Sequence, residues 1–234
     1  LFRELGFDLA LLLEAGQRVA SGASPYDPAM LAGASPSAED LFYSYPPPVA
    51  QAASLIAGVP LGVALAGWAL VAAGGLALVA WLLARRGRPA DPVIAVLATM
   101  ALAPFLFPFA IGVLFGNLDA AYPLLYGAVL LAVLPGSGRG AGVAAGVALA
   151  LASLAKLHPA VIGLWLLVRD IAPHAERSTA RLAVAAALVT VAVVVGGSLA
   201  TFGIDPWTEY GSVIRAGSGA DVVDPRNIAP VSLL

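Results

Sequence analysis

Residues 60–84 read PLGVALAGWALVAAGGLALVAWLLA, without a single charged side chain. An α-helix needs about 20 apolar residues to cross the hydrocarbon core of a bilayer, so this run predicts one full membrane span. Arg85, Arg86 and Arg88 follow it directly. Arginines just after an apolar run are typical of the cytoplasmic end of a span, because positive side chains are retained on that side.

The composition of the whole chain agrees with this stretch. Of 234 residues, 60% are hydrophobic and 11% are charged, whereas a soluble domain carries about 25% charged residues. This excludes a soluble globular domain and a disordered tail. A net charge of −2 also provides no basic surface for the phosphates of nucleic acid. Because the chain has no cysteine, disulfides and cysteine-ligated metals are excluded.

Further uncharged runs, divided by prolines and charged residues, predict an all-α, polytopic transmembrane helical bundle. A short apolar segment at residues 49–58 precedes the first span. About six spans are expected in total, with proline kinks at Pro104 and Pro108 in the second. The spans cover residues 60–84, 93–114, 120–134, 141–156, 159–169 and 182–202.

Charge also separates the two sides of this bundle. Seven of the eleven arginines lie in the loops after the first, third and fifth spans, and the positive-inside rule assigns these loops to the cytoplasm. Residues 1–48 then form a first extracytoplasmic loop, residues 49–202 the transmembrane region, and residues 203–234 a second large extracytoplasmic loop. Since the chain begins with Leu1 instead of methionine, we expect a fragment of a longer protein, truncated at both ends.

The first loop contains a helix and several turn signals. Residues 7–20 are predicted to form a short interfacial helix, with Asp8 near its start, where a carboxylate favours the helix dipole. From the residues alone, Asp8 is either a helix cap or a functional carboxylate, and Asp27 is a turn residue. Tyr45 is either an aromatic anchor at the membrane interface or a site residue.

Two polar motifs interrupt the later spans. Asn117 and Asp119 form a turn, which is either an ordinary connection or a functional polar site. Lys156 is the only lysine, and it lies between apolar runs, where its charge costs on the order of 3 kcal/mol if central. That cost favours a functional role for Lys156. The alternative is that its side chain extends to the membrane interface and places the charge in water. His158 precedes Pro159. It either contacts the ligand that a functional Lys156 would bind, or it only occupies a break between two helices.

These motifs, in their order along the chain, resemble those of the GT-C membrane glycosyltransferases. The first loop carries Gly22-x-x-Pro25-Tyr26-Asp27 and then Tyr45-Pro46-Pro47. Gly116-Asn117-Leu118-Asp119 resembles a Gly-Gln-x-Asn turn, and Lys156-Leu157-His158-Pro159 resembles a Lys-x-x-Pro segment. Asp224-Pro225-Arg226-Asn227 loosely resembles a late Asn-Gln-Ser loop. The pattern is most similar to glycosyltransferase family 87, the polyprenyl-phosphate-mannose-dependent α-mannosyltransferases of actinobacterial envelopes.

The resemblance implies an inverting hexosyltransferase that moves mannose from a polyprenyl-phosphate donor to an envelope glycolipid or lipoglycan. One carboxylate must take the proton of the acceptor hydroxyl, and Asp8 is the candidate base, with Asp119 as the second choice. Cationic groups must stabilise the leaving phosphate, and Lys156 and His158 are the candidates. The remaining candidate substrate-binding residues are Asn117, Asp119, Tyr45, Arg226 and Asn227.

The expected partners are the lipid-linked donor, the acceptor and membrane lipid, without nucleic acid. No cofactor and no metal are predicted, because the second histidine, His174, belongs to a predicted cytoplasmic loop. The expected location is a bacterial plasma membrane, with the site on the extracytoplasmic side. The alternatives are an arabinofuranosyltransferase of the same fold, a transporter or lipid flippase with Lys156 near the midplane, and a structural subunit. An enzyme predicts that Asp8, Asn117 and Lys156 converge at the interface.

Overall fold

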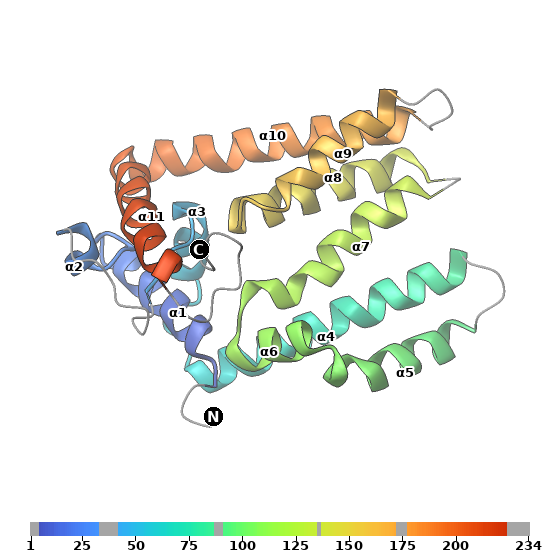
Figure 1. Cartoon of the computed structure of the whole chain (residues 1–234), viewed down its shortest axis with the longest axis horizontal. Coiled ribbons are helices and arrows are strands. Elements are labelled where there is room, and N and C mark those ends of the chain that lie inside the picture. The colour runs from blue at the N-terminus through green and yellow to red at the C-terminus, as the bar shows by residue number, and fades with distance from the viewer. Residues whose placement is uncertain (1–4, 33–41, 87–90, 135–136, 172–176, 224–234) are drawn as a thin grey trace. The chain divides into compact units, whose positions relative to one another are not determined.

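The computed structural model describes residues 5–32, 42–86, 91–134, 137–171 and 177–223, and within these ranges every regular element is a helix (Figure 1). The chain divides into two compact units. The first comprises Leu1–Leu9 with Pro60–Val194, and the second comprises Ala10–Val59 with Val195–Leu234. Helices α1 (Phe7–Ala20) and α10 (Arg177–Phe202) contribute residues to both units.

The first unit is a set of apolar helices. In it α7 packs against both α4 and α8, and α5 packs against α4 (Figure 1). Buried alanine, valine and leucine side chains from α7, α8, α9 and α10 form its main apolar cluster. Besides α10, the elements are α4 (Leu61–Arg86), α5 (Pro92–Leu102), η2 (Ala103–Phe105), α6 (Phe107–Phe115), η3 (Leu118–Ala121), α7 (Tyr122–Val133), α8 (Arg139–Ala155) and α9 (Ala160–Ile171).

Two of the described helices, α4 and α10, are long and apolar enough to cross a membrane. The apolar side chains of both remain largely outside the packed core, as expected for helices that contact lipid: Leu70 is 75% exposed and Leu188 is 67% exposed. The α5–α6 pair adds a third span if the two helices, which lie at an angle of 77° to each other, cross the membrane together as one span.

The expectation of about six spans is therefore not met by the described helices. Helices α7 and α9 have 12 residues each and α8 has 17. At 1.5 Å of rise per residue, 12 residues cover about 18 Å, which is less than the hydrocarbon core of about 30 Å. The apolar runs at residues 120–134, 141–156 and 159–169 were correctly predicted as helices, but their length does not make each of them a span.

The expected kink between Pro104 and Pro108 is present. Here α5 ends, η2 follows, and Leu106 takes a non-helical ψ of 87° before α6 begins. Neither proline has an amide hydrogen for the helical ladder, and each ring clashes with the preceding turn, so the helix breaks between them.

Small residues set the contact between α8 and α10. A Cβ on Gly142 would lie 3.0 Å from the carbonyl oxygen of Thr179, and a Cβ on Gly146 would collide with the carbonyl oxygen of Ala183. The sequence places these glycines four residues apart, the spacing that lets two helix backbones approach closely in lipid. In the structure both glycines lie at such a close approach.

Gly146→Ala is expected to destabilise the protein, although alanine is the better helix former by about 1 kcal/mol. The new methyl group meets backbone atoms of α10, which cannot rotate away, and such overpacking costs about 1–3 kcal/mol. Thermal unfolding in detergent measures the change. Gly67→Ala is the matched control, because a Cβ at Gly67 in α4 meets no atom within 4 Å. Equal melting temperatures for the two variants would contradict the packing argument.

The second unit contains most of α1, together with α2 (Pro28–Leu31), α3 (Pro47–Ser54) and α11 (Asp205–Val223). The predicted helix at residues 7–20 is confirmed as α1. Asp27 is confirmed as a turn residue, since it caps α2 by accepting the Ala29 amide at 2.7 Å. Residues 205–223 were assigned only to a polar loop, yet they form α11, a helix of 19 residues.

Candidate active site

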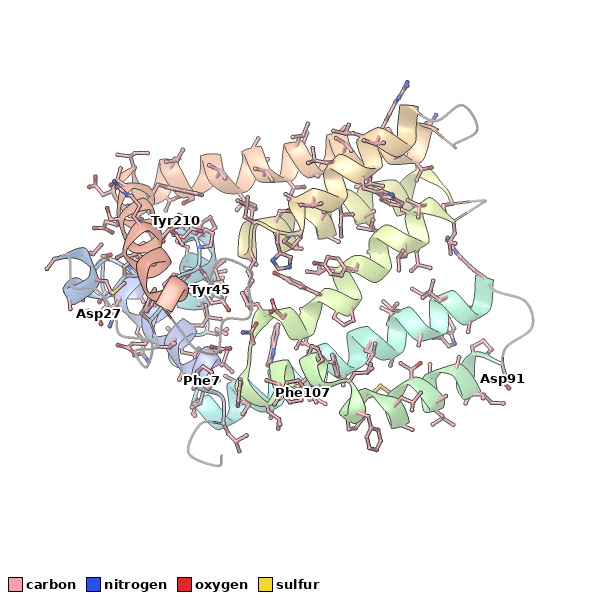
Figure 2. The ribbon with its side chains drawn as sticks, viewed as in Figure 1. Phe7, Asp27, Tyr45, Asp91, Phe107 and Tyr210 are labelled. Atoms are coloured by element: carbon pink, nitrogen blue, oxygen red, sulfur yellow. The ribbon has the colours of Figure 1, made fainter. Side chains whose placement is uncertain are left out.

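The first turn of α1 is held against the end of α6 within the first unit. The amide of Gly6 donates to the carbonyl of Leu114 at 2.9 Å. The rings of Phe7 and Phe115 lie 4.6 Å apart, which is a favourable distance for an aromatic pair. Phe7 is labelled at the beginning of α1 in Figure 2. These contacts fix the position of the next residue, Asp8.

Gly116 lets the end of α6 approach the start of α1 closely. It ends α6 in the left-handed region, with φ of 71°, a conformation that side chains with a Cβ disfavour. A Cβ at this position would also collide with the Cβ of Leu9. Glycine is therefore required here both by the backbone and by the neighbour, and it places the following residue, Asn117, beside α1.

The side chain of Asn117 joins two parts of the site. Its Oδ1 accepts the backbone amide of Asp119 at 2.9 Å, which caps η3. Its Nδ2 donates to Oδ2 of Asp8 at 2.6 Å. Since Asp8 and Asn117 are 109 residues apart in sequence, this contact is a product of the tertiary fold.

Lys156 enters the same cluster from the end of α8. It has extended backbone angles and terminates the helix. Its Nζ lies 2.8 Å from Oδ2 of Asp119 and 3.4 Å from Oδ1 of Asn117. The Lys156 side chain is 30% exposed and that of Asp119 is 43% exposed. The ammonium group is therefore held in a defined position and still reaches solvent.

The electrostatic environment of Asp8 favours its protonated form. Burial raises the pKa of this carboxyl above its ordinary value, and the nearby Asp119 carboxylate adds to the increase. The hydrogen bond from Asn117 and the positive charge of Lys156 oppose it by favouring the ionised form. A carboxylate with a raised pKa is a stronger base, which is the property that general base catalysis requires.

Tyr122 is a neighbour that sequence reasoning missed. It begins α7, three residues after Asp119, and its ring lies 5.5 Å from the ring of the exposed His158. Among the described residues, its buried hydroxyl and the buried Oδ1 of Asp119 have no hydrogen-bond partner. The i, i+3 spacing from Asp119 was the available signal, because residues so spaced lie on one face of a helix.

The structure does not bring every candidate into this cluster. Tyr45 belongs to the second unit, where its ring lies 5.7 Å from that of Tyr43, and its carbonyl accepts the hydroxyl of Tyr26. The ring of Tyr210 on α11 stacks on Tyr26 in the same unit, and Figure 2 labels Tyr45 and Tyr210. Three other predicted positions lie outside the described residues: His174, Arg226 and Asn227.

The cluster within the first unit therefore contains one half-buried carboxylate, one amide and an ammonium–carboxylate pair. Such a set can accept a proton and can stabilise an anion, the two tasks of a transfer reaction with a phosphate leaving group. Over the described ranges, no three histidine, aspartate or glutamate side chains gather closely enough to hold a metal ion.

Comparison with known families agrees with this chemistry. The profile of glycosyltransferase family 87 matches residues 43–233, a segment that includes Asn117, Asp119 and Lys156. Asp8 precedes the matched segment. No curated protein and no solved structure matches the chain. Since the family match covers far more than half of a chain that is rich in exposed apolar helices, this membrane protein belongs to glycosyltransferase family 87.

Proposed function

We propose that the protein is an inverting mannosyltransferase that uses a polyprenyl-phosphate donor and an envelope glycolipid or lipoglycan acceptor. One observation carries the proposal: the Asp8 carboxylate is bonded to Asn117, whose other end lies 3.4 Å from the Lys156 ammonium. A candidate base and a candidate phosphate ligand are thus connected through one side chain. The mannosyl donor and the acceptor class rest on the resemblance to family 87.

The proposed reaction is a single displacement. Asp8 takes the proton of the acceptor hydroxyl while the oxygen of that hydroxyl bonds to the anomeric carbon of the donor. The bond between that carbon and the phosphate oxygen breaks, and its electron pair leaves with the phosphate. Lys156 stabilises the charge on this phosphate. One displacement inverts the anomeric centre, which converts a β-linked donor into an α-linked product.

Charge and helix length support an extracytoplasmic site. The side chain of Leu61, at the start of α4, lies next to Gly6, two residues before Asp8. Helix α4 has 26 residues and rises about 39 Å to its far end. Arg85 and Arg86 occupy that end, which is the cytoplasmic end under the positive-inside rule. Asp8 is then on the opposite side of the bilayer.

The position of the polar groups favours an enzyme over a transporter. Asp8 lies in the first turn of α1, Asn117 follows α6, and Lys156 is the C-cap of α8. Asp8 closely follows Gly6, which lies beside Leu61 at the start of the spanning helix α4. Asn117 is joined both to Asp8 and to Lys156. The cluster therefore lies near one end of α4, whereas substrate groups of a transporter collect near the bilayer midplane between repeated halves. A surface enzyme that receives a lipid-linked donor from the membrane needs its polar groups at the interface.

The other candidate residues take secondary roles in this proposal. Asp119 holds the ammonium of Lys156 in place and therefore does not act as the base itself. His158 is exposed, two residues after Lys156, and is proposed as a second contact to the phosphate. Tyr45, Arg226 and Asn227 remain predicted substrate contacts.

The experiment that tests this function is a transfer assay with the enzyme in native membranes. Radiolabelled polyprenyl-phosphate mannose and the corresponding arabinofuranose donor are supplied separately with membrane lipid acceptors. We expect labelled glycolipid from the mannose donor only. Transfer from the arabinofuranose donor alone would assign the related arabinofuranosyl chemistry, and no transfer from either donor would contradict the proposal.

Lys156→Ala is expected to weaken donor binding, seen as an increase of at least about tenfold in the KM for the donor, because one charge-assisted contact contributes about 1.5–3 kcal/mol. Arg139→Ala is the matched control, since it removes an exposed cation from the opposite end of the same helix. Steady-state kinetics over a range of donor concentrations measures both variants. A normal donor KM in Lys156→Ala would refute its phosphate role.

A further inference from the structure

The orientation of the Asn117 amide is fixed by its surroundings. Its Oδ1 accepts from two donors, the backbone nitrogen of Asp119 at 2.9 Å and Nζ of Lys156 at 3.4 Å. A flipped amide would present its NH₂ group to both donors and its oxygen to the Asp8 carboxylate. The hydrogen-bond network therefore assigns the nitrogen to the side that faces Asp8.

This orientation makes the two oxygens of Asp8 unequal. Oδ2 accepts a hydrogen bond from the side-chain amide of Asn117 at 2.6 Å. It is therefore less available than Oδ1 to accept a proton from the substrate. Oδ1 receives no bond from Asn117. An exchange of the two carboxylate oxygens by rotation would first have to break the hydrogen bond at Oδ2.

We propose that Asn117 is a positioning residue that fixes Oδ2 of Asp8 and leaves Oδ1 as the atom that takes the acceptor proton. The inference rests on the proposed role of Asp8 as the base. The acceptor oxygen bonds to the anomeric carbon, its proton passes to Oδ1, and the carbon–oxygen bond to the donor phosphate breaks with its electron pair. Lys156 reaches the same amide from the other side, so one side chain sets the geometry of base and cation together.

The hydrogen bond also tunes the basicity of Asp8. The charged groups that face this carboxyl are Lys156, from the segment after α8, and Asp119, from η3. The Asn117 bond stabilises the ionised form and thereby lowers the pKa of Asp8 against the effect of burial. Without the bond, the pKa rises. A general base must be ionised to act, so the acid limb of the rate profile then moves to higher pH.

The test compares Asn117→Ser with the parent enzyme. Serine is as good a cap as asparagine and so preserves the turn, but its hydroxyl is too short to reach Asp8 while capping Asp119. We expect an unchanged melting temperature, a kcat reduced about 10- to 100-fold, and an acid limb of kcat/KM displaced to higher pH. A role confined to the turn predicts parental kinetics for this variant.

A second variant covers the case in which Asn117→Ser is not recovered in membranes. Asn117→Asp keeps the capping oxygen and the shape but replaces the donor to Asp8 with an acceptor, so the same displacement of the acid limb is expected. An acid limb at the parental pH in either variant would overturn the positioning role. Asp8→Asn separates the two hypotheses: an active Asp8→Asn overturns the base itself, whereas an inactive one with unshifted Asn117 variants overturns this inference alone.

Discussion

Asp8→Asn is expected to reduce sugar transfer about 10²- to 10⁴-fold, the contribution of a positioned general base. Asparagine has nearly the same shape, and its side-chain oxygen can still accept the amide of Asn117. The change removes only the capacity to take a proton. Transfer is measured with saturating polyprenyl-phosphate donor, and donor binding is measured separately. We expect binding to be largely retained, because the phosphate contacts in the proposal come from Lys156 and His158.

The loss of activity in Asp8→Asn is not expected to reflect unfolding. The pKa of Asp8 is raised in the folded protein, so above this pKa the ionised carboxyl disfavours folding, and the cost disappears below the unfolded pKa. Removal of the charge should leave the melting temperature at neutral pH unchanged or higher. Asp27→Asn is the matched control, since Asp27 also stands at a helix start and asparagine caps as well as aspartate. A variant of Asp8 that retains most activity would exclude it as the base.

Gly116→Ala is expected to lower kcat about 10²-fold while the protein still folds. The methyl group would collide with Leu9, the residue next to Asp8, and so push the start of α1 away from Asn117. A displacement of about 1 Å at a catalytic group costs about 10²-fold in rate. Kinetics and thermal unfolding of the same preparation measure the two effects.

Gly203→Ala separates the collision from the backbone strain. Gly203 also has a positive φ, 76°, but a Cβ there meets no atom within 4 Å. The strain of about 1–2 kcal/mol is therefore common to both variants, and only Gly116→Ala should lose activity. If the two variants were equally active, the close approach of Leu9 and Gly116 would not be important for the site.

Periodicity and charge predicted most of the helices but not their role in the membrane. The helix at residues 7–20 and the proline break after α5 follow from local signals, because caps and prolines act over a few residues. Helix α11 was missed, since Asp205–Val223 contains several glycines and polar residues and has no strong apolar stripe. The described helices give two or three candidate spans where about six were expected, because an apolar run indicates burial or lipid contact without distinguishing them.

The sequence predicted which residues form the candidate site, but not which of their side chains contact each other. Lys156 was selected because its charge lies between apolar runs, and Asn117 because it occupies a polar turn. That Lys156 would pair with Asp119 could not be predicted, because 37 residues separate them and the register of α7 against α8 depends on tertiary packing. Tyr122 was missed although its i, i+3 spacing from Asp119 is a local signal.

The contact between α4 and α7 has a consequence for the depth of the site in the bilayer. Leu124 fits against Gly75, and one turn further along both helices Val79 fits against Gly127. If α7 slid by one turn, Leu124 would meet Val79, and two large side chains would occupy the space of one. The two helices therefore interlock at a single vertical setting. Since Asp119 and Asn117 shortly precede α7, this interlock also sets the depth of the proposed transfer site relative to the spanning helix α4.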